Sequence, residues 1–157
     1  MNNKVFAQYQ FKYYLNGSHF IFIDGKQGQV HPHTWEYILT ILITREHFVE
    51  FNIFEKAIEK YFSAYQGQTI NEIKPFDVVM PTLENMVDYF GEKLRDVIRE
   101  TGGGGELLKI EGSETPTRSY VISFERDDLF MTNVAHYTKE SVDRIFDHLL
   151  DGDQAEG

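Results

Sequence analysis

A change of hydrophobic period along the chain is the feature that most constrains its fold. Residues 5–14 read VFAQYQFKYY, and apolar or aromatic side chains occupy every second position from Val5 to Tyr13. This alternation is typical of a β-strand that buries one face. LNGSH, the apolar FIFI and a turn-like DGKQGQ follow it. A second predicted strand runs from His31 to about Ile43, and its apolar end, YILTILI, favours cover on both faces, for example by another subunit.

The middle of the chain changes to helical spacing, and the end returns to strands. Thr82 in MPTLEN can cap the amide of Asn85, which marks the start of a helix. The later predicted elements are a helix over 53–65, a helix from 82 to the glycines at 102, strands over 107–111 and 119–124, and a helix over 138–150. This order predicts an α+β fold, with a four-stranded antiparallel sheet, two helices on one of its faces and an added C-terminal helix.

Composition excludes several classes of protein. The chain has 157 residues, of which 41% are hydrophobic and 15% aromatic, as in a globular domain. A net charge of −10 argues against general binding to nucleic acid or to an anionic membrane. No apolar run is long enough for a membrane span and the first residues lack a signal-peptide pattern, so we expect a cytoplasmic location. Without cysteine, the chain has no disulfide, thiolate zinc ligand or thiol nucleophile.

Three of the six histidines are candidate metal ligands. His31 and His33 are two residues apart in a predicted strand, so they should point from the same face. His19 follows the first strand and would lie opposite them if the two strands pair. Three neutral imidazoles with an open fourth position are the ligand set of a catalytic zinc ion. Two alternatives stay open: histidines that bind no metal, as most do, and a structural zinc, which would need a fourth protein ligand.

Four motifs, in this order, carry a resemblance to a known family: FKYYLNGSH, HPHTWE, MPTLEN and GSETPTRSY. They resemble the 6-pyruvoyl-tetrahydropterin synthase and 6-carboxytetrahydropterin synthase family over most of residues 5–124. The resemblance implies the tunnelling fold, in which trimers close their strands into one barrel and usually stack in pairs, so a homotrimer or homohexamer is expected. Residues 1–124 would form this domain, and residues 125–157 a C-terminal extension with one helix and an acidic tail.

The resemblance also assigns site residues. The three histidines match the family's zinc ligands, which makes zinc the expected cofactor. Glu114 matches the carboxylate that anchors the pterin by accepting two hydrogen bonds from its amino-pyrimidinone edge. Thr115 beside it and Thr82 of the Pro-Thr-x-Glu segment are further candidate ligand-binding residues. Thr82 and Glu84 have an equally good structural interpretation, as a helix start with a favourable charge.

The chain departs from the family at the positions for proton transfer. The family has a catalytic cysteine four residues before the first histidine of its His-x-His motif, and Gln27 stands there in this chain. An amide has no useful pKa for proton transfer. The Asp-His pair expected after the first helix is missing from SAYQGQTINEI. Asp24 and His136 are the candidates to move the proton instead.

Functions of different classes therefore stay open. The first is a protein that binds a pterin or purine nucleotide in a zinc-containing pocket between subunits, with lost or altered lyase activity. The second is an active zinc-dependent, phosphate-eliminating lyase that converts 7,8-dihydroneopterin triphosphate to a 6-substituted tetrahydropterin. The third is a regulatory sensor of a purine signalling nucleotide such as a cyclic dinucleotide. Lys26, Lys109 and Arg118 are candidates to contact phosphates.

Overall fold

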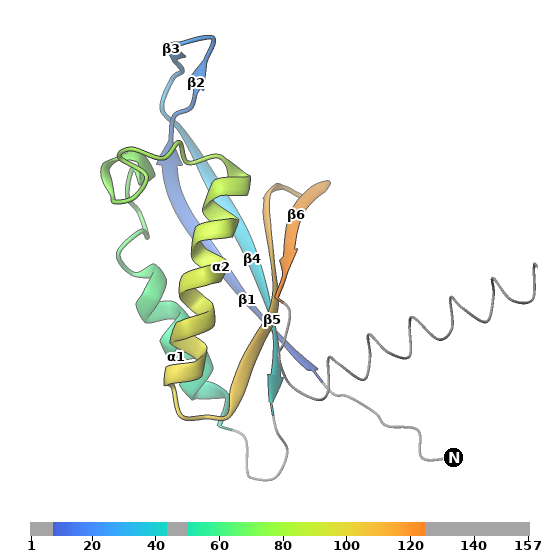
Figure 1. Cartoon of the computed structure of the whole chain (residues 1–157). Coiled ribbons are helices and arrows are strands. Elements are labelled where there is room, and N and C mark those ends of the chain that lie inside the picture. Colours follow the sequence, from blue (N-terminus) through green and yellow to red (C-terminus); the bar gives the residue numbers. More distant parts are fainter. Residues whose placement is uncertain (1–7, 44–49, 125–157) are drawn as a thin grey trace, which may run out of the picture. The chain divides into compact units, whose positions relative to one another are not determined.

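The structure is a computed structural model, and it describes residues 8–43 and 50–124 (Figure 1). The helix expected over 138–150, the acidic tail and His136 lie outside the described residues. None of the described helices is long and apolar enough to cross a membrane.

One antiparallel sheet organises the described residues. Its strands are β1 (Gln8–His19), β4 (His31–Ile43), β5 (Gly105–Thr115) and β6 (Arg118–Ser123), in the order β1-β4-β5-β6. Apart from the short strands β2 and β3, strands that follow one another in the sequence are also neighbours in the sheet. The sheet is therefore a meander, with the helices inserted between β4 and β5. The predicted four-stranded antiparallel sheet is confirmed.

Helices α1 (Phe51–Phe62) and α2 (Leu83–Glu100) cover the same face of this sheet (Figure 1). A short 3₁₀ turn, η1 (Ile70–Glu72), lies between them in the chain. The Oγ1 atom of Thr82 accepts a hydrogen bond from the Asn85 amide at 3.2 Å, so the predicted cap of α2 is confirmed. The fold is the predicted α+β arrangement with both helices on one face.

The core lies between the helices and the sheet, and aromatic rings dominate it. Its largest fully buried side chains are Trp35, Tyr37, Phe54, Phe62, Phe76 and Phe90. The other face of β4 is less well covered, since Ile38 and Leu42 are half-buried while Thr40 is buried. The apolar run in β4 therefore has a complete cover on the helix side and a partial one on the other side within this chain.

The structure corrects two boundaries near the ends of the strands. β1 continues through LNGSH to His19, because these residues pair with the start of β4. β5 continues through Glu114 and Thr115, which the sequence placed between two strands. The longer strands carry three candidate residues, His19, Glu114 and Thr115, to one end of the sheet.

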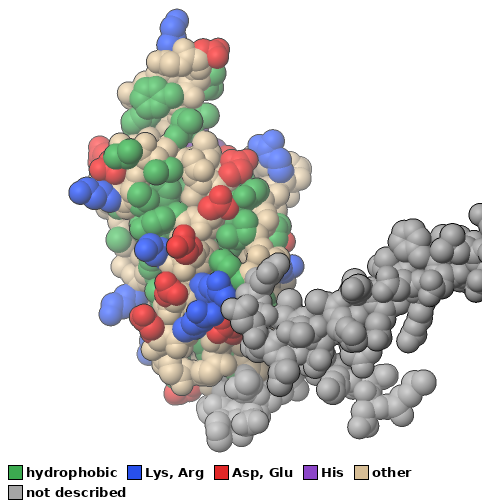
Figure 2. Space-filling model, viewed as in Figure 1, with side chains coloured by type: hydrophobic (Ala, Val, Ile, Leu, Met, Phe, Trp, Pro, Cys, Tyr) green, Lys and Arg blue, Asp and Glu red, His purple; other side chains and the backbone are tan. Residues whose placement is uncertain are grey.

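A small hairpin between β1 and β4 was not predicted. β2 (Phe22–Ile23) pairs with β3 (Lys26–Gln27), and Asp24 and Gly25 form the turn with φ angles of 52° and 75°. Two successive positive φ angles are typical of a type I′ hairpin turn, and Asp-Gly is a preferred pair there. The hairpin projects beyond the end of the sheet (Figure 1) and exposes hydrophobic side chains, including Phe22 and Ile23 (Figure 2).

Candidate metal centre

The pairing of β1 with β4 brings three histidines together at one end of the sheet. His19 lies opposite His31, and Gly17 lies opposite His33. Residues directly opposite each other in an antiparallel pair share a face, and this face is the one that carries Leu15 and Trp35 into the core. One nitrogen from each imidazole can be chosen so that all three lie within 4.8 Å of one another. The grouping expected from the sequence is present, and the three residues could hold a metal ion.

Backbone carbonyls orient two of the three rings. The Nδ1 atom of His19 donates a hydrogen bond to the carbonyl of Pro81 at 2.8 Å, and Nδ1 of His31 donates to the carbonyl of Gln29 at 2.9 Å. A carbonyl oxygen can only accept, so Nδ1 carries the proton and Nε2 keeps a free lone pair. Histidines that bind metals commonly have their second nitrogen held in this way. Neither carbonyl partner could be predicted from the sequence.

The chain on both sides of His19 is also fixed. The amide of Ser18 donates to the carbonyl of Gln68 at 3.0 Å, and the side chain of Asn71 bonds both the amide and the carbonyl of Phe20, each at 2.9 Å. A β-carbon at Gly17 would lie 2.9 Å from the Gln68 carbonyl oxygen, so this close approach requires glycine. The loop after α1 thus closes over the end of β1 and buries the first histidine.

Burial sets the charge state of His19. Its side chain is 3% exposed, and loss of solvation lowers its pKa from the usual 6.5, an effect to which the neighbouring imidazoles add. The Pro81 carbonyl and Glu114 act in the opposite direction but do not reverse the shift. The neutral imidazole is the form that binds a metal, so the ring is in its ligating form at neutral pH.

Glu114 lies beside the histidines. Its Oε1 atom accepts a hydrogen bond from Nε1 of Trp35 at 3.1 Å and lies 3.9 Å from Nε2 of His19. Glu114 also lines a hollow of about 360 Å³ whose other walls are mostly hydroxyl-bearing. The hollow is lined by Tyr14, Thr34, Glu36, Ser113, Glu114, Thr115, Pro116 and Ser119. A carboxylate at this position can accept hydrogen bonds from a ligand in the hollow while a metal lies close by.

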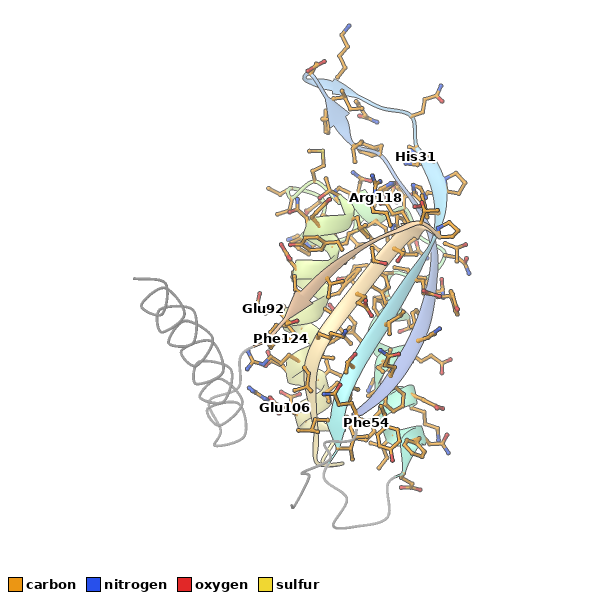
Figure 3. The ribbon with its side chains drawn as sticks, turned by 90° about the vertical axis from the view of Figure 1, so that its right-hand side faces the viewer. His31, Phe54, Glu92, Glu106, Arg118 and Phe124 are labelled. Atoms are coloured by element: carbon orange, nitrogen blue, oxygen red, sulfur yellow. The ribbon has the colours of Figure 1, made fainter. Side chains whose placement is uncertain are left out.

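The other candidate ligand-binding residues divide into two groups. Thr115 lines the same hollow, and Arg118 pairs with it at the start of β6. Arg118 lies at the same end of the sheet as His31 (Figure 3). Thr82 caps α2 directly after Pro81, so its position is explained by the helix start. Lys109 lies opposite Ser123, in the part of β5 away from this end.

Asp24 and Lys26, two of the candidates from the sequence, are not in the histidine cluster. Asp24, Lys26 and Gln27 lie on the β2–β3 hairpin, where all three are exposed. Asp24 occupies the turn itself. Its role as a base remains a prediction, as does that of His136, which lies outside the described residues.

Trp35 is the site residue that sequence reasoning missed. It is the sole tryptophan of the chain, it is fully buried, and it contacts both Glu114 and the imidazoles. A signal was available, because Trp35 follows His33 by two positions in a predicted strand and must therefore share its face.

Solved structures of known proteins share this fold. A 6-pyruvoyl tetrahydropterin synthase from Caenorhabditis elegans matches with a TM-score of 0.64 at 14% identity, over 79% of this chain and 99% of that chain. A catalytic-residue mutant of the Plasmodium vivax 6-pyruvoyltetrahydropterin synthase matches with a TM-score of 0.56 at 13% identity, over 76% and 98%. An uncharacterised protein of Wolinella succinogenes matches with a TM-score of 0.57 at 12% identity, over 78% and 100%.

The sequence itself also matches a family. No curated protein matches the chain, but the family model described as 6-pyruvoyl tetrahydropterin synthase matches residues 7–125. This match covers most of the chain and includes the three histidines and Glu114. The chain therefore belongs to the 6-pyruvoyl tetrahydropterin synthase family.

Proposed function

We propose that this protein binds a pterin or purine-nucleotide ligand in a zinc-containing pocket, and that its lyase activity is lost or altered. One observation carries the proposal: a three-histidine cluster and the Glu114 carboxylate lie together at one end of the sheet. At the positions that the family uses for proton transfer, the chain has Gln27 in place of the cysteine and no Asp-His pair in residues 63–73. A pocket of this kind can hold a ligand without the means to convert it.

The donor set fits zinc. Three imidazole nitrogens leave one position of a tetrahedral zinc ion for a ligand or water, which is the pattern of catalytic rather than structural sites. The hydrogen bonds from Nδ1 of His19 and His31 supply the outer support that zinc-bound histidines usually have. When bound, zinc would supply Lewis acidity toward an oxygen atom of the ligand.

Glu114 supports a ligand with paired N–H donors. Its Oε1 atom already accepts from Trp35, and a carboxylate has further lone pairs, so acceptor capacity remains on this residue of the hollow. A pterin presents a ring N–H and an amino group on one edge, and guanine presents the same pair. The chemistry of the carboxylate therefore supports both classes of ligand. Arg118, at the same end of the sheet, could form ion pairs with their phosphates.

The hairpin favours binding over turnover. Gln27 stands where the family has its cysteine, and an amide neither accepts nor releases a proton at useful pH. Asp24 is the nearest carboxylate in sequence, but it occupies an exposed turn. A base must come within hydrogen-bonding reach of the proton that it removes. The alternative, an active lyase, requires this turn to reach the ligand in the assembled protein.

An assembly of several copies is part of the proposal. β1 and β6 are the outer strands of the described sheet, and outer strands offer backbone groups for pairing with another chain. Tyr9, Phe11 and Phe51 contribute to a hollow of about 610 Å³ beside β1 that a neighbouring strand could fill. These features support the homotrimer or homohexamer that we expect.

The test is binding and turnover measured on the same zinc-loaded protein. We would incubate it with 7,8-dihydroneopterin triphosphate, identify products by mass spectrometry, and measure binding by calorimetry with GTP and a cyclic dinucleotide alongside. Glu114→Ala should abolish binding, whereas Glu111→Ala, on the same strand but outside the hollow, should not. Formation of a tetrahydropterin by the wild type would establish the lyase instead. No binding of any of these compounds would refute the proposal.

A further inference from the structure

We infer that Trp35 is the positioning residue that couples the histidine cluster to the ligand-anchoring carboxylate. That a ligand binds at Glu114 rests on the proposed function. That Trp35 links Glu114 to the histidines rests on the geometry of the described residues. Trp35 contacts both parts of the site, the imidazoles and the Glu114 carboxylate. Among the described residues, its indole N–H is the hydrogen-bond donor that Glu114 has.

The indole ring contacts two of the imidazoles. Its centroid lies 5.1 Å from that of His19 with the planes at 84°, and 5.2 Å from that of His33 with the planes at 51°. These are the edge-to-face and tilted arrangements that aromatic pairs prefer. Trp35 is 0% exposed, so the ring cannot turn away without opening the core. It therefore limits how far the two imidazoles can rotate.

The indole N–H fixes the carboxylate. An indole nitrogen can only donate a hydrogen bond, and the one from Trp35 goes to Oε1 of Glu114 at 3.1 Å. A buried indole N–H needs such a partner, so the bond should persist in the free protein. Oε1 is also the oxygen that lies 3.9 Å from Nε2 of His19. The bond thus holds the carboxylate beside the cluster, and the carboxylate keeps further lone pairs with which it can accept from a ligand.

The first test uses the fluorescence of this residue. Because Trp35 is the sole tryptophan, its emission can be excited separately from that of the nine tyrosines. Cobalt(II) bound to the histidines should quench this emission, with saturation at one equivalent per chain, because the indole contacts two of the ligand rings. The His33→Ala variant should lose the quenching. Cobalt that binds with its characteristic visible spectrum but leaves the emission unchanged would overturn the inference.

The second test removes the N–H and keeps the ring. The single tryptophan can be replaced during expression by 3-benzothienylalanine, which has nearly the same shape without a donor, and Trp35→Phe serves as a second variant. Loss of a hydrogen bond to a charged group should weaken binding of 7,8-dihydroneopterin triphosphate about 10-fold. The ring contacts remain, so zinc affinity measured by chelator competition should stay within about threefold. Equal losses in both affinities would indicate a merely structural role.

A double-mutant cycle separates this inference from the proposed function. If the wild type binds no probe, the proposed function fails by itself, and the coupling is then judged from unfolding of the zinc-loaded protein. The analogue should lower the urea midpoint in the wild type by clearly more than it does in Glu114→Ala, because the shared bond is already absent there. Additive changes would overturn the inference.

Discussion

Two neighbouring regions of this molecule are held in different ways. The histidine end of the sheet has one buried and two half-buried histidines, backbone carbonyls hold the rings of His19 and His31, and two long strands set its register. The β2–β3 hairpin, which carries Asp24 and Gln27, consists of two-residue strands with exposed side chains. The positions that could bind a metal are therefore built into the fold, while Asp24 and Gln27 lie on an exposed hairpin outside the core. Binding can persist in such a protein after proton transfer is lost.

The largest expected difference between the two regions is in their effect on zinc affinity. We expect His33→Ala to weaken zinc binding by more than about 100-fold, because loss of a ligand should exceed the 10–100-fold typical of an outer-shell partner. Asp24→Asn on the hairpin should leave zinc affinity unchanged. Competition with a fluorescent chelator measures both variants. A loss of similar size in Asp24→Asn would place the hairpin in the metal site and contradict the distinction drawn here.

Two glycines, one in the sheet and one in the hairpin, should differ in how much their substitution lowers the free energy of unfolding. A β-carbon at Gly112 would clash with Cγ2 of Val87, so Gly112→Ala should overpack the core and cost about 3 kcal/mol. Gly25 has a φ of 75° in the hairpin turn but no neighbour within 4 Å. Gly25→Ala should cost less than about 1 kcal/mol of global stability, because strain there can be relieved by local opening. Urea unfolding gives both values, and equal costs would show that the hairpin is part of the core.

Two basic residues distinguish the regions in ligand binding. Arg118 borders the end of the sheet that carries His31, whereas Lys26 lies on the hairpin. If the ligand carries phosphates and lies in the Glu114 hollow, Arg118→Ala should weaken it about 10-fold, as for loss of one charged contact. Lys26→Ala should change affinity less than twofold. The reverse order in calorimetry would move the phosphates toward the hairpin.

The core near the histidine cluster contains a buried hydroxyl, that of Tyr37, without a hydrogen-bond partner among the described residues. The Oη atom of Tyr37 is buried without a hydrogen bond among the described residues, and desolvation raises the pKa of this phenol well above 10.0. Tyr37→Phe should therefore stabilise the protein by about 1 kcal/mol. It should also reduce the loss of stability above pH 10, where the unfolded phenol ionises and the folded one does not. Unchanged stability at both neutral and alkaline pH would show that the hydroxyl is satisfied, for example by water.

Local pattern predicted most of the fold and the centre of the site. The period of two in β1 and β4 sufficed to place His31 and His33 on one face, and strand pairing added His19. The carbonyl partner of His19 could not be predicted, because Pro81 is 62 residues away in the sequence. The hairpin was missed because its strands are too short to show a period. Glu114 was found through family resemblance, and only strand pairing shows that it lies beside the histidines.

The most direct test of the account is X-ray absorption at the zinc edge, on the zinc-loaded protein with and without 7,8-dihydroneopterin triphosphate. We predict three imidazole nitrogens and an oxygen ligand that is not from the protein, with only the oxygen shell changing when the ligand binds. A closed site with four protein ligands, or a spectrum that shows fewer than three imidazoles, would contradict the central claim that this end of the sheet is an open metal centre.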